Sequence, residues 1–297
     1  MNVVGPPAAG FKRRMLVVDG LATSFLEAGV GNGDPLVLLH GGEFGASAEL
    51  GWERNIGTLA SCHHVIAPDQ LGYGQTAKAI DFNDGRRMRI RHVARLCDLL
   101  DIESAGFVGN SMGGVNLLVD STSARPLLPV HSMIVICGGG EILRNRYSSA
   151  LFEYDASFEG MRKIVEALFH DPSYPANDAY VQRRYESSIA PGAWEAIAAA
   201  RFRRPGPPDN ELGPKEDPQY ERIDVPTLMV AGGDDKLKPV GWAAEIAKRI
   251  PEGDSLVVDN AAHCPQVEQP ELVNQMILDF FAARGSRATV DGRKDDR

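Results

Sequence analysis

The chain has 297 residues, of which 43% are hydrophobic and 24% charged, and its formal net charge is −9. This length and composition predict one α/β domain of ordinary core size with an insertion. The negative charge argues against nucleic acid as a partner, because nucleic acid requires a basic surface. No apolar run is long enough to span a membrane and the N-terminus has no apolar signal core, so we expect a cytoplasmic protein.

Apolar runs of strand type recur along the chain, and runs with helical spacing lie between most of the later ones. Such an alternation predicts a doubly wound, mostly parallel sheet of eight strands, with the first strands antiparallel. The expected strands are 15–18, 23–27, 36–40, 64–68, 106–109, 133–137, 227–230 and 256–258. The expected helices around the sheet are 49–59, 87–100, 112–121, 241–249 and 271–283.

One of these helix candidates carries a local basic cluster, residues 86–92, in a chain that is acidic overall. Apolar residues recur through this segment at helical spacing, at Ile90, Val93, Cys97 and Leu100. We interpret the cluster as the solvated basic face of a helix rather than as a binding patch.

The alternation of strands and helices stops between residues 141 and 217. This stretch has no strand signal, and its helix candidates are 159–170, 179–187 and 191–201. Proline-rich segments at 204–209 and 213–218 indicate the return of the chain to the sheet. We expect a core formed by 1–140 and 218–285, a helical cap at 141–217 over the functional site, and a flexible tail at 286–297.

The most informative motif is Gly109-Asn-Ser-Met-Gly113, a G-x-S-x-G turn between an apolar run and a helix candidate. A strand that ends in this turn before a helix is typical of a nucleophile elbow. The two glycines remove Cβ atoms that would clash, and Ser111 takes a strained conformation at the helix N-terminus. The bare pattern also occurs in ordinary glycine-rich turns, so it needs support from residues further along the chain.

A serine nucleophile requires a base, and the base requires an orienting carboxylate. In this arrangement the chain order is serine, acid and histidine, each in a loop at the carboxyl end of a strand. The apolar run after residue 226 ends in two aspartates, and the run after residue 255 ends in a histidine. We therefore predict Ser111, Asp235 and His263 as a catalytic triad. Asp234 is the alternative acid, and both aspartates could instead cap a helix.

Acyl transfer also requires hydrogen-bond donors for the oxyanion. Residues 36–42 form an apolar strand candidate followed by His-Gly-Gly, ahead of the elbow in the chain. We predict the backbone N–H groups of Gly42 and Met112 as the two donors, because glycine lets the backbone approach a substrate closely. A plain glycine-rich loop is the alternative interpretation.

The four cysteines, at positions 62, 97, 137 and 264, are scattered and form no Cys-x-x-Cys pair. They therefore predict neither a zinc site nor a disulfide framework, and no metal or organic cofactor is implied. Cys264 directly follows the predicted catalytic histidine, and we expect a structural role for it because Ser111 already provides a nucleophile. The expected partner is a small-molecule substrate.

The whole chain resembles the α/β-hydrolase superfamily. Several stretches are more narrowly similar to the meta-cleavage-product hydrolases, which cut a carbon–carbon bond in products of aromatic ring cleavage. The stretches that carry this resemblance in the core are 40–46 with Trp52, 69–78 and 109–114, and those in the cap are 160–168 and 181–186.

The resemblance implies that Arg184 binds the 2-hydroxy-acid carboxylate of the substrate, for which a bidentate guanidinium is well suited. It also implies that Asn110 polarises the dienol end and that Gly41 contacts the substrate. In this mechanism the dienolate is first ketonised, and His263 then assists the attack of water or Ser111 on the distal ketone. A homodimer is expected from the resemblance alone.

Four positions depart from the family pattern. Glu43-Phe44 stands where Gly-Pro is usual, Gly51 where many relatives have Asn, and Cys264 where Trp is usual. Glu43 would repel an anionic substrate unless it points away or pairs with an arginine. These departures keep open a carboxylester or lactone hydrolase on the same fold. A third alternative is a ligand-binding protein without catalysis.

Overall fold

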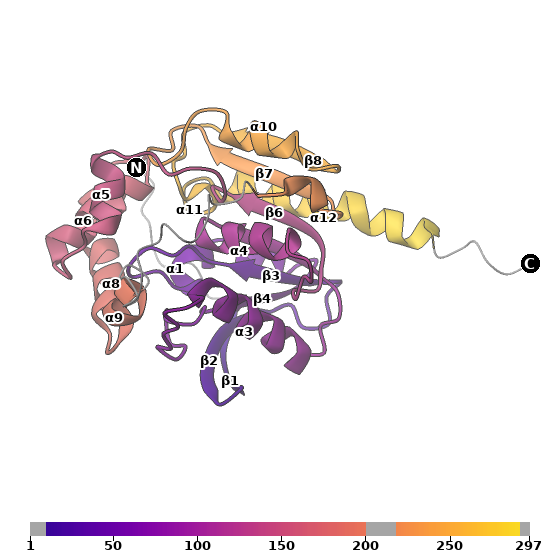
Figure 1. Cartoon of the computed structure of the whole chain (residues 1–297), viewed down its shortest axis with the longest axis horizontal. Helices are drawn as coiled ribbons and strands as arrows, with labels where there is room; N and C mark the ends of the chain where they lie inside the picture. Colours follow the sequence, from indigo (N-terminus) through magenta and orange to yellow (C-terminus); the bar gives the residue numbers. More distant parts are fainter. Residues whose placement is uncertain (1–9, 200–217, 292–297) are drawn as a thin grey trace, which may run out of the picture.

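The computed structural model describes residues 10–199 and 218–291, and its centre is a single eight-stranded sheet (Figure 1). The strand order is β1-β2-β4-β3-β5-β6-β7-β8. The first two strands pair antiparallel with each other, β2 pairs antiparallel with β4, and the other pairings are parallel. The predicted fold class and all eight predicted strands are therefore confirmed. The strands are β1 Lys12–Val18, β2 Leu21–Ala28, β3 Pro35–Leu39, β4 His64–Pro68, β5 Ala105–Asn110, β6 Val130–Ile136, β7 Thr227–Gly232 and β8 Gly253–Val258.

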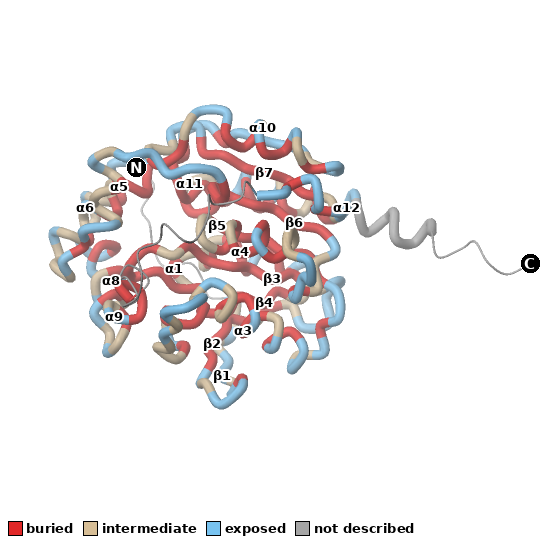
Figure 2. Tube along the Cα trace, viewed as in Figure 1, coloured by how far each residue is buried: buried red, intermediate tan, exposed pale blue. Residues whose placement is uncertain are grey.

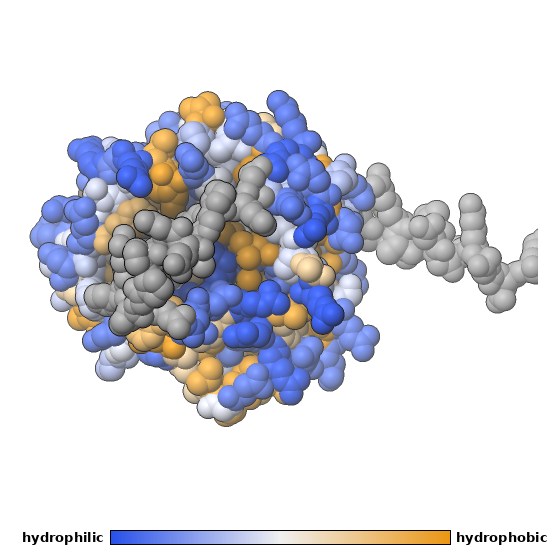
Figure 3. Space-filling model, in the orientation of Figure 1, coloured by the Kyte–Doolittle hydropathy of each residue, from blue (hydrophilic) through white to orange (hydrophobic). Residues whose placement is uncertain are grey.

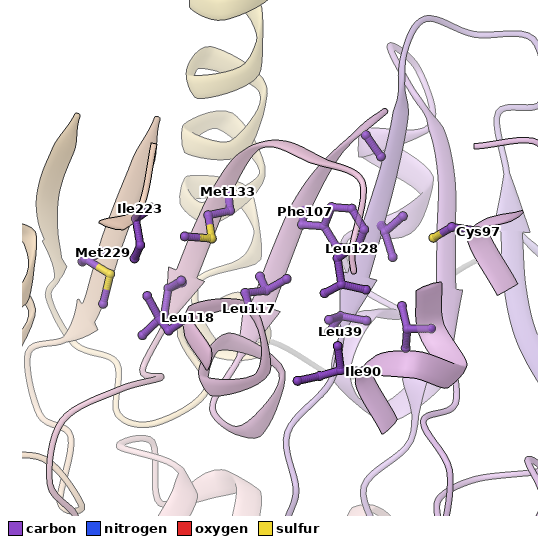
Figure 4. Close-up of a cluster of buried hydrophobic side chains, with 14 of the residues drawn as sticks. Leu39, Ile90, Cys97, Phe107, Leu117, Leu118, Leu128, Met133, Ile223 and Met229 are labelled. Carbon is purple, nitrogen blue, oxygen red and sulfur yellow. The ribbon is translucent and has the colours of Figure 1, made fainter. Parts of the chain in front are cut away.

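Helices cover both faces of the sheet, so the central strands are buried on both sides (Figure 2). On one face Phe107 of β5 packs in a cluster with Ile90 and Leu117, which belong to α3 and α4 (Figure 4). On the other face its neighbour Val108 packs in a second cluster with Trp52 and Ile277. Because successive strand residues point to opposite faces, both must be apolar, which explains the continuous apolar runs of the sequence. The first face carries α3 Gly85–Leu99, α4 Met112–Ser121 and α10 Trp242–Ala247. The second face carries α1 Ala48–Trp52, α2 Ile56–Leu59 and α12 Pro270–Asp291.

The prediction of one helix over 49–59 is wrong, because the chain forms two short helices there. Asn55 lies between them, fully buried, and its side chain donates to the Gln266 carbonyl at 3.0 Å and to Asn274 Oδ1 at 2.8 Å. These contacts tie the segment to α11, residues Pro265–Glu268, and to α12. At the C-terminus, α12 extends to Asp291, beyond the expected end at residue 283, and the last residues of the predicted tail, 292–297, lie outside the described residues.

In the described stretch between β6 and residue 199, five helices lie together at one end of the molecule (Figure 1). Side chains of four of them share a buried cluster with Phe44 and Leu237, which come from loops of the sheet, and with Leu50 of α1. The candidates 159–170, 179–187 and 191–201 correspond to helices, the last of them described only to residue 199, whereas α5 and α7 were not predicted. The proline-rich segments 204–209 and 213–217 lie outside the described residues, and the division into core and cap stays a prediction. The helices are α5 Arg146–Phe152, α6 Phe158–Leu168, α7 Ser173–Ala176, α8 Asp178–Ile189 and α9 Ala193–Ala198.

The remaining described elements are a short 3-10 helix, Tyr220–Arg222, and α11, Pro265–Glu268, which follows the loop after β8. No helix in the described ranges combines the length and apolar character needed to cross a membrane. On the face seen in Figure 3, hydrophilic residues predominate and hydrophobic residues form small separate patches.

Candidate active site

The strand, turn and helix predicted around Ser111 are confirmed. β5 ends at Asn110, α4 begins at Met112, and Ser111 between them has a φ of 48°, a conformation that L residues rarely adopt. A Cβ on Gly109 would lie 2.5 Å from the Gly113 carbonyl carbon, and a Cβ on Gly113 would overlap the Leu39 carbonyl oxygen. Both flanking positions of the turn therefore require glycine, and the turn presents the serine at the carboxyl edge of the sheet.

The structure brings Ser111, His263 and Asp235 together in one hydrogen-bonded chain. His263 Nε2 lies 2.8 Å from Ser111 Oγ, and His263 Nδ1 lies 2.8 Å from Asp235 Oδ2. The alternative acid, Asp234, points elsewhere, since its carboxylate lies 3.3 Å from Nδ1 of His170 near the surface. The geometry thus favours Asp235 over Asp234 as the partner of His263.

The Asp235 carboxylate is held in one orientation. Its Oδ1 accepts the Leu237 N–H at 2.9 Å while its Oδ2 faces the imidazole. Burial raises the pKa of Asp235, but the His263 charge and these hydrogen bonds outweigh it, so the pKa lies below its usual value. An ionised Asp235 stabilises a proton on the histidine, as a base that accepts the serine proton requires.

The two predicted oxyanion donors come from the loop after β3, which carries Gly42, and from the start of α4 at Met112. The N–H of Met112 belongs to the first turn of α4, where a helix offers no internal acceptor. Opposite it, a Cβ on Gly42 would meet the Met112 side chain at 2.8 Å, so only glycine fits there. His40 holds this loop, since its Nε2 accepts the Gln70 N–H at 3.0 Å and its Nδ1 lies 2.6 Å from the Gly41 carbonyl. Burial lowers the pKa of His40, which keeps the ring neutral for these two roles.

A cavity of about 630 Å³ opens beside the serine and is lined by Ser111, His263, Gly42 and Met112. The four residues that the sequence predicted for nucleophile, base and oxyanion donors thus share one space. Much of the wall is apolar and comes from both the sheet loops and the helices α5, α6 and α9: Val115, Ile142, Leu151, Phe152, Leu168, Ile197 and Leu237. Such a wall suits the apolar part of a small organic substrate.

Arg184 and Asn110, which the resemblance implies as substrate-binding residues, are buried and hydrogen-bond to other groups of the protein. Arg184 is 2% exposed and is not among the lining residues; its Nη1 donates to Glu43 Oε1 at 2.9 Å and its Nε to the Tyr180 hydroxyl at 3.1 Å. Asn110 is also 2% exposed, and its amide donates to the His263 and Ile136 carbonyls at 3.0 and 3.3 Å. Asn110 therefore fixes the loop that carries the histidine.

Glu43, one of the departures from the family pattern, lines the cavity but is not free to repel an anion. Burial raises the pKa of Glu43, but the charge of Arg184 and its hydrogen bond outweigh this and hold the pKa below its usual value. The carboxylate is thus ionised and neutralised by Arg184. The sequence contained the signal for this pair, since an unusual acid and an arginine occurred in one predicted site.

In the described part of the chain, one group of side chains has the spacing of metal ligands: Cys137, Asp235 and His263, whose ligand atoms lie within 4.8 Å of one another. Burial and the Asp235 charge raise the pKa of the Cys137 thiol well above its usual value, which disfavours the thiolate that a metal ligand requires. Asp235 and His263 are already joined to each other and to Ser111 by hydrogen bonds, so this group fits a metal site poorly. Burial also raises the pKa of Cys264, in accordance with the structural role expected for it.

Sequence reasoning missed three cationic side chains of the cavity, Arg86, Arg89 and Lys238. Residues 86–92 form part of α3, as predicted, and Arg86 and Arg91 are exposed. The interpretation of the cluster as a solvated face is wrong for Arg89, which is 8% exposed and points toward the cavity side of the helix. The sequence showed a basic cluster at these positions, and helical periodicity placed Arg89 next to the apolar Ile90. Periodicity does not say which other part of the protein Arg89 contacts.

Comparison with known proteins identifies the family. The Alpha/beta hydrolase family matches residues 36–276. The chain is 32% identical to a 2-hydroxy-6-oxo-6-(2'-aminophenyl)hexa-2,4-dienoic acid hydrolase of Metapseudomonas resinovorans, over 93% of each chain. It is 28% identical to a 2-hydroxy-6-oxo-2,4-heptadienoate hydrolase of Pseudomonas putida, over 91% of this chain and 96% of that protein.

Solved structures similar to this chain also belong to hydrolases. A serine hydrolase involved in carbazole degradation matches with a TM-score of 0.77 and 30% identity, covering 92% of this chain and 99% of the other. A meta-cleavage product hydrolase from Pseudomonas fluorescens matches with a TM-score of 0.79 and 26% identity, covering 91% and 98%. The fold, the site and these similarities lead to one conclusion: the chain belongs to the α/β-hydrolase family and is an enzyme that resembles the meta-cleavage-product hydrolases.

Proposed function

We propose that the chain is a serine hydrolase that cleaves the carbon–carbon bond of a 2-hydroxy-6-oxohexa-2,4-dienoate, with Ser111, His263 and Asp235 as its catalytic triad. The observation that carries the proposal is the hydrogen-bonded chain of these residues at the wall of a largely apolar cavity. Relatives that match nearly the full chain act on dienoates of this class, which supports the same class here.

The mechanism follows from the positions of the groups. His263 accepts a proton from Ser111 or from water, and the oxygen that loses this proton attacks the distal ketone carbon. The N–H groups of Gly42 and Met112 stabilise the resulting oxyanion. Ketonisation of the dienol beforehand moves its proton to C5 and creates a 2-oxo group. When the C5–C6 bond breaks, C5 leaves with the electron pair, which is delocalised into the 2-oxo group as a dienolate, and the dienolate takes a proton. One water is consumed, and the products are a carboxylic acid and a 2-hydroxypenta-2,4-dienoate.

The alternative is an ester or lactone hydrolase with the same triad, in which no ketonisation is needed. One observation favours it: Glu43 occupies the guanidinium of Arg184, which the resemblance implies should bind the substrate carboxylate. The roles of Arg184, Asn110 and Gly41 in substrate binding therefore stay predictions. A homodimer and a cytoplasmic location also stay predictions, supported by the resemblance and by composition, respectively.

Paired stopped-flow assays test the proposal. One substrate is 2-hydroxy-6-oxo-6-phenylhexa-2,4-dienoate, followed by the loss of its visible absorbance, and the other is a short p-nitrophenyl ester. We expect fast loss of the dienoate and slow ester turnover, both abolished in Ser111→Ala. Ester turnover with an inert dienoate would replace the proposal by the esterase alternative, and turnover that persists in Ser111→Ala would exclude the triad.

A further inference from the structure

The cavity contains a pair of arginines that the mechanism above does not use. Arg89 lies on α3 and is 92% buried, since its exposed fraction is 8%. Its Nε donates to the Leu71 carbonyl at 3.1 Å and its Nη1 to the Gly85 carbonyl at 3.2 Å, and its guanidinium lies 5.7 Å from the centre of the Tyr73 ring. All three contacts are to uncharged groups, so the charge of Arg89 is oriented but not neutralised.

Arg86, one turn earlier on the same helix, lies at the mouth of the same cavity. Its Nη1 donates to Asn116 Oδ1 at 3.0 Å, and the Asn116 amide in turn donates to Gln70 Oε1 at 2.9 Å. This partner is again neutral. Burial of the guanidinium and the charge of Arg89 lower the pKa of Arg86, and the Asp84 charge offsets part of this effect.

No carboxylate among the residues that the structure describes forms an ion pair with Arg86 or Arg89. Two carboxylates lie on the loop before α3 and accept backbone N–H groups. Asp84 caps the helix by accepting the Arg87 N–H, and Asp81 accepts the N–H groups of Asn83 and Asp84. Arg86 is exposed and the Asp84 charge acts on it, whereas Arg89 is buried and donates only to neutral carbonyls. A buried cation without a paired carboxylate is costly, and an anion that joins Arg89 and Arg86 would lower that cost. The arrangement therefore indicates a ligand that carries negative charge.

Two other charged groups of the cavity wall have partners of opposite charge. Glu43 is paired with Arg184, and Lys238, whose Nζ donates to the carbonyls of Gly139, Gly140 and Glu141, is also acted on by the Asp235 charge. The arginine pair also lies close to the chemistry: Tyr73, beneath Arg89, donates its hydroxyl to the Gly42 carbonyl at 2.9 Å. A smaller hollow of about 240 Å³ shares Arg86, Arg89 and Met112 with the main cavity, and Asp81 also lines it. The side of the arginine pair that faces the main cavity therefore offers the room for an anionic group.

We propose that Arg86 and Arg89 form the anion subsite of this enzyme and bind the carboxylate of an acidic substrate, while Arg184 serves to neutralise Glu43. The inference rests on the proposed function, because it names the part of the cavity that holds the acid end of that substrate. A planar guanidinium pair matches a carboxylate through parallel N–H donors. The substrate would then extend from the arginine pair, past the oxyanion donors, into the apolar wall.

Equilibrium binding tests the subsite without requiring turnover. In the Ser111→Ala background, calorimetry measures the affinity for 2-hydroxy-6-oxo-6-phenylhexa-2,4-dienoate, for hexa-2,4-dienoate and for the neutral hexa-2,4-dienamide. We expect Arg89→Gln and Arg86→Gln each to lower the affinity for both carboxylates about 10- to 100-fold, since each removes a hydrogen bond to a charged group. The amide affinity should stay unchanged, Arg89→Lys should restore part of the loss, and Arg91→Gln, an exposed arginine of the same helix, is the matched control.

The two proposals fail in different ways. If both arginine variants bind the carboxylates as tightly as the Ser111→Ala parent, or lose acid and amide affinity equally, the anion subsite is excluded while the hydrolase function stands. A parent protein that shows no preference for the carboxylates over the amide also overturns it. If the preference for carboxylates depends on Arg86 and Arg89 but the dienoate is never cleaved, the subsite stands and the carbon–carbon hydrolase function fails.

Discussion

Removing one partner of the buried Glu43–Arg184 pair should destabilise the fold strongly. The side chains are 6% and 2% exposed, and their charges lie 2.9 Å apart. In Arg184→Met the Glu43 carboxylate stays buried without its counter-charge, which costs about 3–5 kcal/mol. That is a large part of the stability of an ordinary domain, which is about 5–15 kcal/mol. The double variant Glu43→Gln, Arg184→Met removes both charges and should be less destabilised than the sum of the single variants by at least about 2 kcal/mol.

Urea unfolding followed by tryptophan fluorescence measures all four free energies of this double-mutant cycle. The exposed pair Arg95–Asp98, with side chains 47% and 64% exposed, is the matched control, and its coupling should stay below about 0.5 kcal/mol. Additive single variants at the buried pair would refute the conclusion that Arg184 neutralises Glu43 in the folded state.

The same variants should differ in their pH dependence. In the wild type the pKa of Glu43 lies below its usual 4.5, so the pair stabilises the fold above that pH and this contribution is lost as the pH falls. In Arg184→Met the main influence that lowers the pKa of Glu43 is gone, and burial, the largest influence, then raises it, so protonation stabilises the folded variant. The deficit of the variant should therefore shrink as the pH falls from 7 toward 4.5. A deficit that is constant over this range would contradict the assigned charge state.

Three further predictions concern the triad, the elbow and a buried histidine. Asp235→Asn should lower kcat about 10⁴-fold because it disturbs the His263 tautomer, whereas Asp234→Asn at the surface should retain nearly wild-type kcat. Gly113→Ala should destabilise the fold or prevent its expression as soluble protein, since the added Cβ overlaps a backbone carbonyl of β3; a wild-type unfolding midpoint would contradict that geometry. Burial lowers the pKa of His92 to about 4, so the wild type should lose up to about 3 kcal/mol of stability as the pH falls from 6.5 through 4, a loss that urea titrations should find reduced in His92→Gln.

The local parts of the site could be predicted from the sequence because each is fixed by short-range chemistry. The elbow requires glycine on both sides of Ser111, and the acid and histidine loops each follow an apolar strand. Parallel strands deliver their carboxyl ends to one edge of the sheet, so correct strand order in the chain is enough to predict that Ser111, Asp235 and His263 meet. The Gly42 loop also follows an apolar strand, so its position at the same edge of the sheet could be predicted in the same way.

Contacts between distant segments could not be predicted in this way. Glu43 and Arg184 are separated by 141 residues, and nothing local in either segment requires that they pair. The helix break at Asn55 likewise depends on partners more than 200 residues further along the chain.

The sequence by itself determined the fold class, the turn at Ser111 and the chain order of Ser111, Asp235 and His263, because strand periodicity and turn sterics depend on neighbouring residues only. The tertiary structure alone decided which arginine is neutralised and which charges face the cavity. Arg184 fits the family pattern in sequence but is occupied by Glu43, and Arg89 resembles a solvated helix residue but is buried beside the site. Charge pairing and burial depend on which surfaces meet in three dimensions, and local sequence patterns do not specify that.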